Sequence, residues 1–167
     1  GDMIFLIGRS RNDVNGSEYV RKVHRINSSL PPYYDAAEEQ EMQQVVSGMI
    51  DKGLVRSVHD VSNGGLFFSL LECAIPLEFG FDITTDAEIR KDAFLFGESQ
   101  SRVIVSVSAE KQDMFVDYMV EQEFPFSILG HVTKGELRID DESFGFVEDL
   151  KKSFENQLKD WVEGKKI

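Results

Sequence analysis

The sequence is poor in the residues that build disulfides, zinc sites and catalytic dyads, with one cysteine and three histidines among 167 residues. Cys73 has no disulfide partner within the chain, which fits a reducing compartment. Its neighbours Leu71, Ala74 and Ile75 predict a small buried side chain rather than a reactive thiol. Histidines, cysteines and carboxylates do not recur at zinc-site spacing, so we expect no structural metal. No Ser/His/Asp triad can be assembled either.

Positive charge is also scarce, since 18 lysines and arginines face 30 aspartates and glutamates and leave a net charge of −12. Broad binding of DNA or RNA needs a basic surface, so this class of function is excluded. A small anionic ligand is compatible with the charge, because a few backbone N–H groups can bind phosphate on an acidic protein. The chain has no apolar run of membrane-spanning length and no recognisable signal peptide, so we expect a cytoplasmic protein without membrane contact.

The apolar content is substantial, at 41% with 13 phenylalanines, and predicts a packed globule. We expect one domain over residues 1–167, of α+β class, with a mixed β-sheet covered by helices. Apolar patterning predicts strands over residues 3–7, 54–58, 79–83, 102–107, 126–132, 136–139 and 144–147. It predicts helices that begin at Ser17 and Thr85 and others over 36–52, 65–74, 109–122 and 148–162, the last with a stripe of Leu150, Phe154, Leu158 and Trp161. The chain opens with Gly1-Asp2 directly before a strand, and we expect it to be a fragment of a larger protein.

The most informative segment is His59-Asp60-Val61-Ser62-Asn63-Gly64-Gly65-Leu66. A predicted strand, two glycines and a helix start are typical of a place where backbone N–H groups face an anion. Asp60 offers a carboxylate to a hard cation and Ser62 a hydroxyl to a phosphate oxygen, so a nucleotide with magnesium would suit them. The alternative is a tight connection in which Asp60 or Ser62 caps the helix.

Two further segments carry clustered polar residues. In Phe96-Gly97-Glu98-Ser99-Gln100-Ser101-Arg102, the side chains could bind a sugar, an amide or a phosphate, or Glu98 and Arg102 could pair within a polar loop. Residues 8–19 could form a second phosphate-facing loop, although a solvated turn that ends in a helix cap is the interpretation we favour. We expect His24 on a solvated basic surface and His131 in a structural role within its strand.

These segments, followed by Leu129-Gly130-His131-Val132-Thr133, resemble the motif order of the formylglycinamide ribonucleotide amidotransferases. This family, also called the phosphoribosylformylglycinamidine synthases, belongs to the aminoimidazole ribonucleotide synthetase superfamily. The match is to the C-terminal type of domain, and the openings at 1–8 and 16–19 extend it to essentially the whole chain. The resemblance implies ATP-dependent amidation of formylglycinamide ribonucleotide by glutamine-derived ammonia, in purine biosynthesis. It implies a place in the second of two tandem halves.

The resemblance also assigns roles by position. Asp60 matches a Mg²⁺ ligand, and Ser62, with Gly64 and Gly65, matches the contact to ATP or ADP in an auxiliary site. A second set, Glu98, Ser99 and Gln100, matches a motif that contacts the ribonucleotide substrate. The family's catalytic histidine and ATP-binding lysine belong to other domains, so this chain is expected to hold no catalytic residue and to be inactive alone.

The implied partners are the other domains of the same synthase and a glutaminase, either fused or separate. The sequence ends soon after Trp161, and from this we expect the glutaminase to be a separate subunit. Two other interpretations stay open. The chain could be a purely structural domain that packs the synthase together, or a domain of another ATP-dependent enzyme of the superfamily.

Overall fold

The computed structural model describes the backbone of residues 1–162 and the side chains up to residue 156. It contains one seven-stranded sheet in the order β2-β4-β1-β5-β3-β6-β7. The strands are β1 (Met3–Ile7), β2 (Ser57–Asp60), β3 (Gly80–Ile83), β4 (Val103–Val107), β5 (Phe126–Thr133), β6 (Glu136–Ile139) and β7 (Glu142–Phe146). The pairing of β3 with β6 is parallel and the others are antiparallel, which confirms the predicted mixed sheet and the α+β class.

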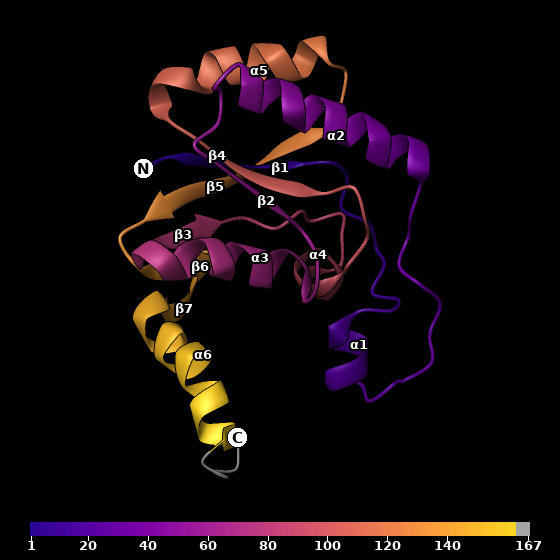
Figure 1. Cartoon of the computed structure of the whole chain (residues 1–167), viewed down its shortest axis with the longest axis vertical. Coiled ribbons are helices and arrows are strands. Elements are labelled where there is room, and N and C mark those ends of the chain that lie inside the picture. Colours follow the sequence, from indigo (N-terminus) through magenta and orange to yellow (C-terminus); the bar gives the residue numbers. More distant parts are fainter. Residues whose placement is uncertain (163–167) are drawn as a thin grey trace.

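Strand β1 lies inside the sheet, where it pairs with β4 on one side and β5 on the other. Its sequence, Met3-Ile4-Phe5-Leu6-Ile7, is apolar at every position because both of its faces are covered. Phe5 and Ile7 enter the core on one face of the sheet, and Ile4 and Leu6 enter the core on the other. The helices therefore form two layers around the sheet (Figure 1).

The first layer consists of α2 (Ala36–Asp51) and α5 (Gln112–Glu121). Met42, Val45 and Met49 of α2 recur every three or four residues, and they pack with Phe115 and Met119 of α5 against the sheet. Asp35 begins α2, since its Oδ1 accepts hydrogen bonds from two backbone N–H groups of the first turn. The predicted helix over 36–52 is thus confirmed to within a residue.

The second layer consists of α3 (Gly65–Ala74), α4 (Lys91–Phe96) and the start of α6 (Val147–Val162). Leu66 and Leu70 of α3 are buried against the sheet, as expected for a helix that is apolar nearly all round. From this layer α6 extends away from the body toward the C-terminus (Figure 1). Leu150 packs against the core, whereas Phe154 is exposed. Leu158, Trp161 and residues 163–167 lie outside the described side chains, so the rest of the predicted stripe stays a prediction.

Two predicted elements are displaced in the structure. The strand expected over 54–58 lies at Ser57–Asp60, because Leu54 ends the preceding helical turn and is inserted into the core. The helix expected to start at Thr85 begins instead at Lys91. Thr85 donates from its N–H and its hydroxyl to the carboxylate of Asp140, at 2.7 and 2.8 Å, and so holds the chain after β3 against the chain after β6.

Smaller corrections concern helix and strand ends. The helix predicted over 109–122 starts with a 3₁₀ turn, Ala109–Lys111, and becomes α-helical only at Gln112. The strand predicted over 144–147 is β7, which runs from Glu142 to Phe146, and Val147 already belongs to α6. In the described part of the chain, no helix has the length and apolar character needed to cross a bilayer.

The two ends of the sheet differ in what they carry. At one end lie Ile7, Asp60, Ile83, Val103 and Phe126, followed or preceded by the loops that the sequence singled out. We call this the motif end. At the other end lie Met3, Ser57, Gly80, Val107 and Thr133, which we call the pocket end for the hollow described below.

Candidate functional site

The motif end brings together three segments that are far apart in the sequence. Residues 8–16 follow β1, residues 61–65 follow β2, and residues 97–102 lead into β4, which lies between β1 and β2 in the sheet. Because β4 is antiparallel to both neighbours, its start lies beside their ends. The N–H of Val61 donates to the carbonyl of Arg102 at 2.9 Å and joins two of these segments directly.

Glycines allow the three backbones to touch. Gly65 has φ +73°, and a Cβ placed there would lie 2.7 Å from the carbonyl oxygen of Gly97 and 2.8 Å from that of Leu95. At Gly97, a Cβ would collide with the carbonyl oxygens of Ala93 and Asp13. Side chains at these two positions would therefore force the segments apart.

Glu98 is the central buried acid of this arrangement, only 8% exposed. Its Oε1 accepts hydrogen bonds from the N–H of Gly64 and the N–H of Glu18, both at 2.8 Å. Glu18 begins the short helix α1 (Glu18–Lys22), so one carboxylate holds the starts of α1 and α3 together. The N–H of Gly65 donates to the carbonyl of Ser62 at 3.0 Å. Both glycine N–H groups that could have faced an anion are thus engaged within the chain.

Asp60 and Ser62 have exposed side chains at the mouth of the turn. The Asp60 side chain is 75% exposed, and its neighbour His59 lies with Nδ1 2.7 Å from the Asp60 carbonyl oxygen and Nε2 3.3 Å from Glu72. The residue that begins α3 is Gly64, without a capping side chain, so the alternative in which Asp60 or Ser62 caps this helix is wrong. Both side chains are therefore accessible from the solvent.

The described residues offer too few ligands to hold a cation alone, but they could contribute to a site that other groups complete. Among the described residues, no three His, Cys, Asp or Glu side chains gather where they could hold a metal ion. Asp60 could supply one oxygen ligand to Mg²⁺, which commonly takes one or two carboxylates together with phosphate oxygens and water. The remaining ligands would have to come from outside this chain's described carboxylates.

The second motif is mostly buried. Ser99 is 1% exposed, and its hydroxyl has no hydrogen-bond partner in the part of the chain that the structure describes. Gln100 is exposed, although its N–H donates to the carbonyl of Tyr33 at 3.1 Å and its side chain donates to the carbonyl of Glu98. Of the three predicted substrate contacts, only Gln100 thus presents its side chain at the surface.

Arg102 is a buried cation whose hydrogen bonds to backbone carbonyl groups hold this loop in its conformation. Its Nε and Nη2 donate to the carbonyl oxygens of Ser99 and Gly97 at 3.0 and 2.6 Å. Burial lowers the pKa of the guanidinium to about 10, against the opposing effect of the Asp13 and Glu98 carboxylates, so it remains charged at neutral pH. The alternative of a direct Glu98–Arg102 ion pair is not seen among the described residues, since both groups bond to backbone instead.

Two residues of this cluster, Tyr33 and Glu39, were not marked by any sequence pattern. Tyr33 donates its N–H to Asp13 at 2.8 Å, and the guanidinium of Arg11 lies 3.6 Å from the centre of the Tyr33 ring. The hydroxyl of Ser101 donates to Glu39 of α2 at 2.8 Å. The segment over 8–19 does end in a helix cap, because the Ser17 hydroxyl accepts the N–H of Val20. The same segment is joined to the second motif, because the N–H of Glu18 donates to the Glu98 carboxylate.

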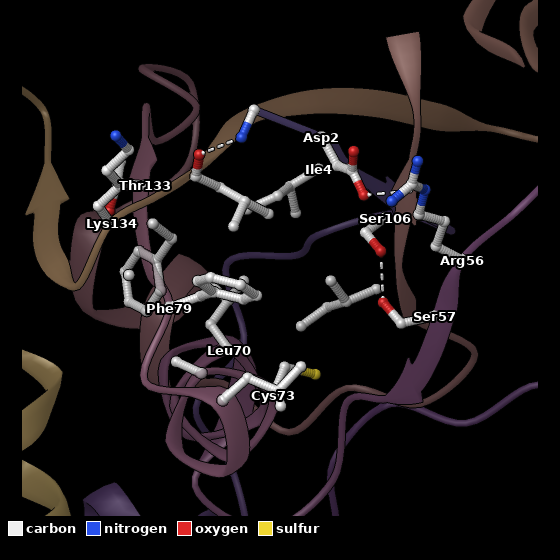
Figure 2. A pocket seen from close by; sticks show the side chains of 17 residues that line it. Asp2, Ile4, Arg56, Ser57, Leu70, Cys73, Phe79, Ser106, Thr133 and Lys134 are labelled. Carbon is white, nitrogen blue, oxygen red and sulfur yellow. Dashed lines mark hydrogen bonds and ion pairs between the residues drawn. The ribbon is translucent and has the colours of Figure 1, made fainter. Parts of the chain in front are cut away.

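A separate hollow of about 550 Å³ lies at the pocket end, and Figure 2 shows the side chains that line it. Apolar side chains such as Ile4, Leu70 and Phe79 line it. The hydroxyls of Ser57 and Ser106 lie 2.6 Å apart on its wall, and Arg56 lies 3.4 Å from Asp2. None of the predicted site residues is among its lining residues.

Cys73 also lines this hollow, and its expected burial is wrong because the residue is exposed. Desolvation of the sulfur and the adjacent Glu72 carboxylate raise the thiol pKa to about 11. The thiol is therefore protonated at neutral pH, in agreement with the prediction that it is not a reactive group. His24 and His131 are both exposed.

Comparison with known proteins gives consistent results. The family model of the AIR synthase related protein, C-terminal domain, matches residues 1–142. The PurL subunit of phosphoribosylformylglycinamidine synthase from Caldanaerobacter subterraneus subsp. tengcongensis is 35% identical over 139 residues, which are 83% of this chain and 19% of that protein. The chain thus spans about a fifth of the length of this curated relative.

Solved structures resemble the fold. PurL from Thermotoga maritima complexed with FGAR superposes with a TM-score of 0.73 at 15% identity, over 90% of this chain and 27% of that one. The same protein complexed with ATP gives a TM-score of 0.67 at 17% identity, over 90% of this chain and 26% of that one. At these identities the likeness concerns the fold.

Proposed function

The chain belongs to the family of AIR synthase related protein C-terminal domains, and we propose that it is such a domain of a phosphoribosylformylglycinamidine synthase. The synthase would convert formylglycinamide ribonucleotide to the amidine with ATP and glutamine-derived ammonia, in purine biosynthesis. The observation that carries the proposal is the 35% identity to a PurL subunit over 83% of the chain. The convergence of the sequence motifs at one end of the sheet supports it.

In this proposal, residues 1–167 form a single domain that lines an auxiliary Mg²⁺–nucleotide cleft at the motif end. Asp60 would give one oxygen ligand to Mg²⁺, and the Ser62 hydroxyl would bond a phosphate oxygen of ATP or ADP. Gly64 and Gly65 would contribute the shape of the turn, since their N–H groups are bonded to Glu98 and Ser62. ATP, when bound for catalysis, supplies the phosphoryl group that makes the amide oxygen of the substrate a leaving group.

The second motif would act mainly by positioning. Glu98 fixes the start of α3 through Gly64, and it thereby fixes the place of Ser62. Gln100, whose side chain is exposed, would be the member of the motif that reaches a ribonucleotide substrate, whereas the Ser99 hydroxyl is buried. This chain would contribute no catalytic residue and would not turn over substrate alone. Its partners would be the other synthase domains and a glutaminase.

The test is made in the full-length synthase with Asp60→Ala combined with Ser62→Ala. The matched control is Asp117→Ala combined with Ser127→Ala, which removes the same groups from exposed positions on α5 and β5. We expect the first variant to retain at least ten-fold less ATP or ADP after purification, measured by chromatography of the released nucleotide, and the control to match the wild type. Unchanged nucleotide content with unchanged thermal stability would instead support a purely structural domain.

A further inference from the structure

The segment between α1 and α2 exposes several large apolar side chains. Residues 21–34, which we call the arm, run from the end of α1 through an irregular stretch beside the body of the domain (Figure 1). Within the arm, Val23 is 62% exposed, Ile26 49%, Leu30 74% and Tyr34 61%. Four large apolar side chains exposed within one segment of 14 residues provide the apolar surface that an interaction site needs.

The arm also differs from the rest of the chain in charge. Residues 19–34 include no aspartate or glutamate, although the chain as a whole carries a net charge of −12. Arg21, Lys22 and Arg25 surround, with Asn27, a shallow hollow of about 240 Å³. A surface that is complementary to the arm would therefore be apolar at its centre and acidic at its rim.

The arm is held in place by the same residues that shape the motif end. The Ser29 hydroxyl accepts the N–H of Gly16 at 2.9 Å. Tyr33 donates its N–H to Asp13 and accepts the N–H of Gln100 at 3.1 Å. The apolar side chains are thus presented from a backbone that is anchored to the candidate site, which lowers the entropic cost of binding a partner.

We propose that a neighbouring domain of the same synthase polypeptide docks on the arm. The neighbouring domain then forms the outer wall of the cleft at the motif end. The inference rests on the proposed function. Three observations select this occupant: the positive charge of the arm on an acidic domain, its attachment to the motif loops, and the 81% of the PurL relative that lies outside the matched region. The neighbouring domain would seat Leu30 in an apolar hollow with carboxylates at its rim.

The experiment compares amide hydrogen exchange of residues 23–34 in the isolated 167-residue chain and in the full-length synthase. We expect exchange in the arm to be at least ten-fold slower in the full-length protein. Val23→Asp combined with Leu30→Asp should abolish this protection, whereas Leu77→Asp, at a similarly exposed position that lines the pocket end, should preserve it. Lys22→Glu combined with Arg25→Glu provides a second variant that leaves the apolar residues in place and should also reduce the protection.

Equal exchange of the arm in the two proteins would overturn the proposal. So would protection that appears in the isolated chain as its concentration rises, which would indicate a second copy. Protection that needs phosphatidylglycerol vesicles would point to a membrane surface instead and would equally contradict it. Amidine formation by the wild-type full-length protein is measured in parallel. A protected arm without this activity would uphold docking and reject the synthase function. An active enzyme with an unprotected arm would uphold the synthase function and reject docking.

Discussion

The two ends of the sheet differ in how closely their backbones pack and in what their polar groups bond to. At the motif end, buried polar groups such as Glu98 and Arg102 bond to backbone from three segments, and glycines let those backbones touch. At the pocket end, the strands border a hollow of about 550 Å³, and its polar groups pair with one another at its wall. The first end depends on every member of a network, whereas the second can lose a contact and relax. We therefore expect substitutions at the two ends to differ sharply in cost.

The largest effect is expected for Gly65→Ala. The new Cβ would meet the backbone of the second motif at 2.7–2.8 Å and would force a residue with φ +73° to carry a side chain. Overpacking and backbone strain together should cost roughly 3–5 kcal/mol of unfolding free energy, measured by urea denaturation.

Gly145→Ala is its control, since Gly145 also has a positive φ of +92° but open space where a Cβ would lie. That variant should lose only about 1–2 kcal/mol from backbone strain. Similar losses for the two variants would show that close approach at the motif end is unimportant.

A smaller but still substantial loss is expected for Glu98→Ala. Removing the carboxylate leaves the N–H groups of Gly64 and Glu18 without their acceptor in a buried place. The cost should be about 2–4 kcal/mol, and exchange of those two amides should become faster than in the wild type. Glu41→Ala, at an exposed position of α2, should stay within about 0.5 kcal/mol of the wild type. If Glu98→Ala were as mild as this control, the network would not hold the motif end.

The smallest effects are expected at the pocket end. Ser57→Ala or Ser106→Ala alone breaks the hydroxyl pair and should cost about 0.5–1 kcal/mol. The double variant should cost less than the sum of the two, because neither hydroxyl is then left without its partner. A double-mutant cycle in urea measures this coupling. A coupling as large as the loss in Glu98→Ala would erase the proposed difference between the two ends.

Local patterning predicted most of the elements but few of the long-range contacts. The apolar helix over 65–74 and the cap at Ser17 are signalled by residues three or four positions apart, and both are found as expected. The place of β2 could not be read in this way, because Leu54 and Val55 look like strand residues while Leu54 in fact fills the core beside a helix end.

The candidate site shows the same limit. The sequence marked Asp60, Ser62 and Glu98 as polar residues beside glycines, and the structure brings their segments together. The Glu98 carboxylate accepts hydrogen bonds from N–H groups that are 34 and 80 residues away in the sequence. These groups meet because of the order of strands in the sheet, which a local sequence pattern does not reveal. Tyr33 and Glu39 escaped notice for the same reason, since their partners Asp13 and Ser101 lie 20 and 62 residues away.

The position of β1 between β4 and β5 has a consequence for how the domain folds. Its five apolar residues pair with residues 103–107 and 126–133, which lie far along the chain. Before these pairings form, both edges of the strand carry unpaired backbone groups that can pair with other chains. Contacts between residues so distant in sequence slow folding, because the long intervening chain must be closed into a loop before the strands can pair.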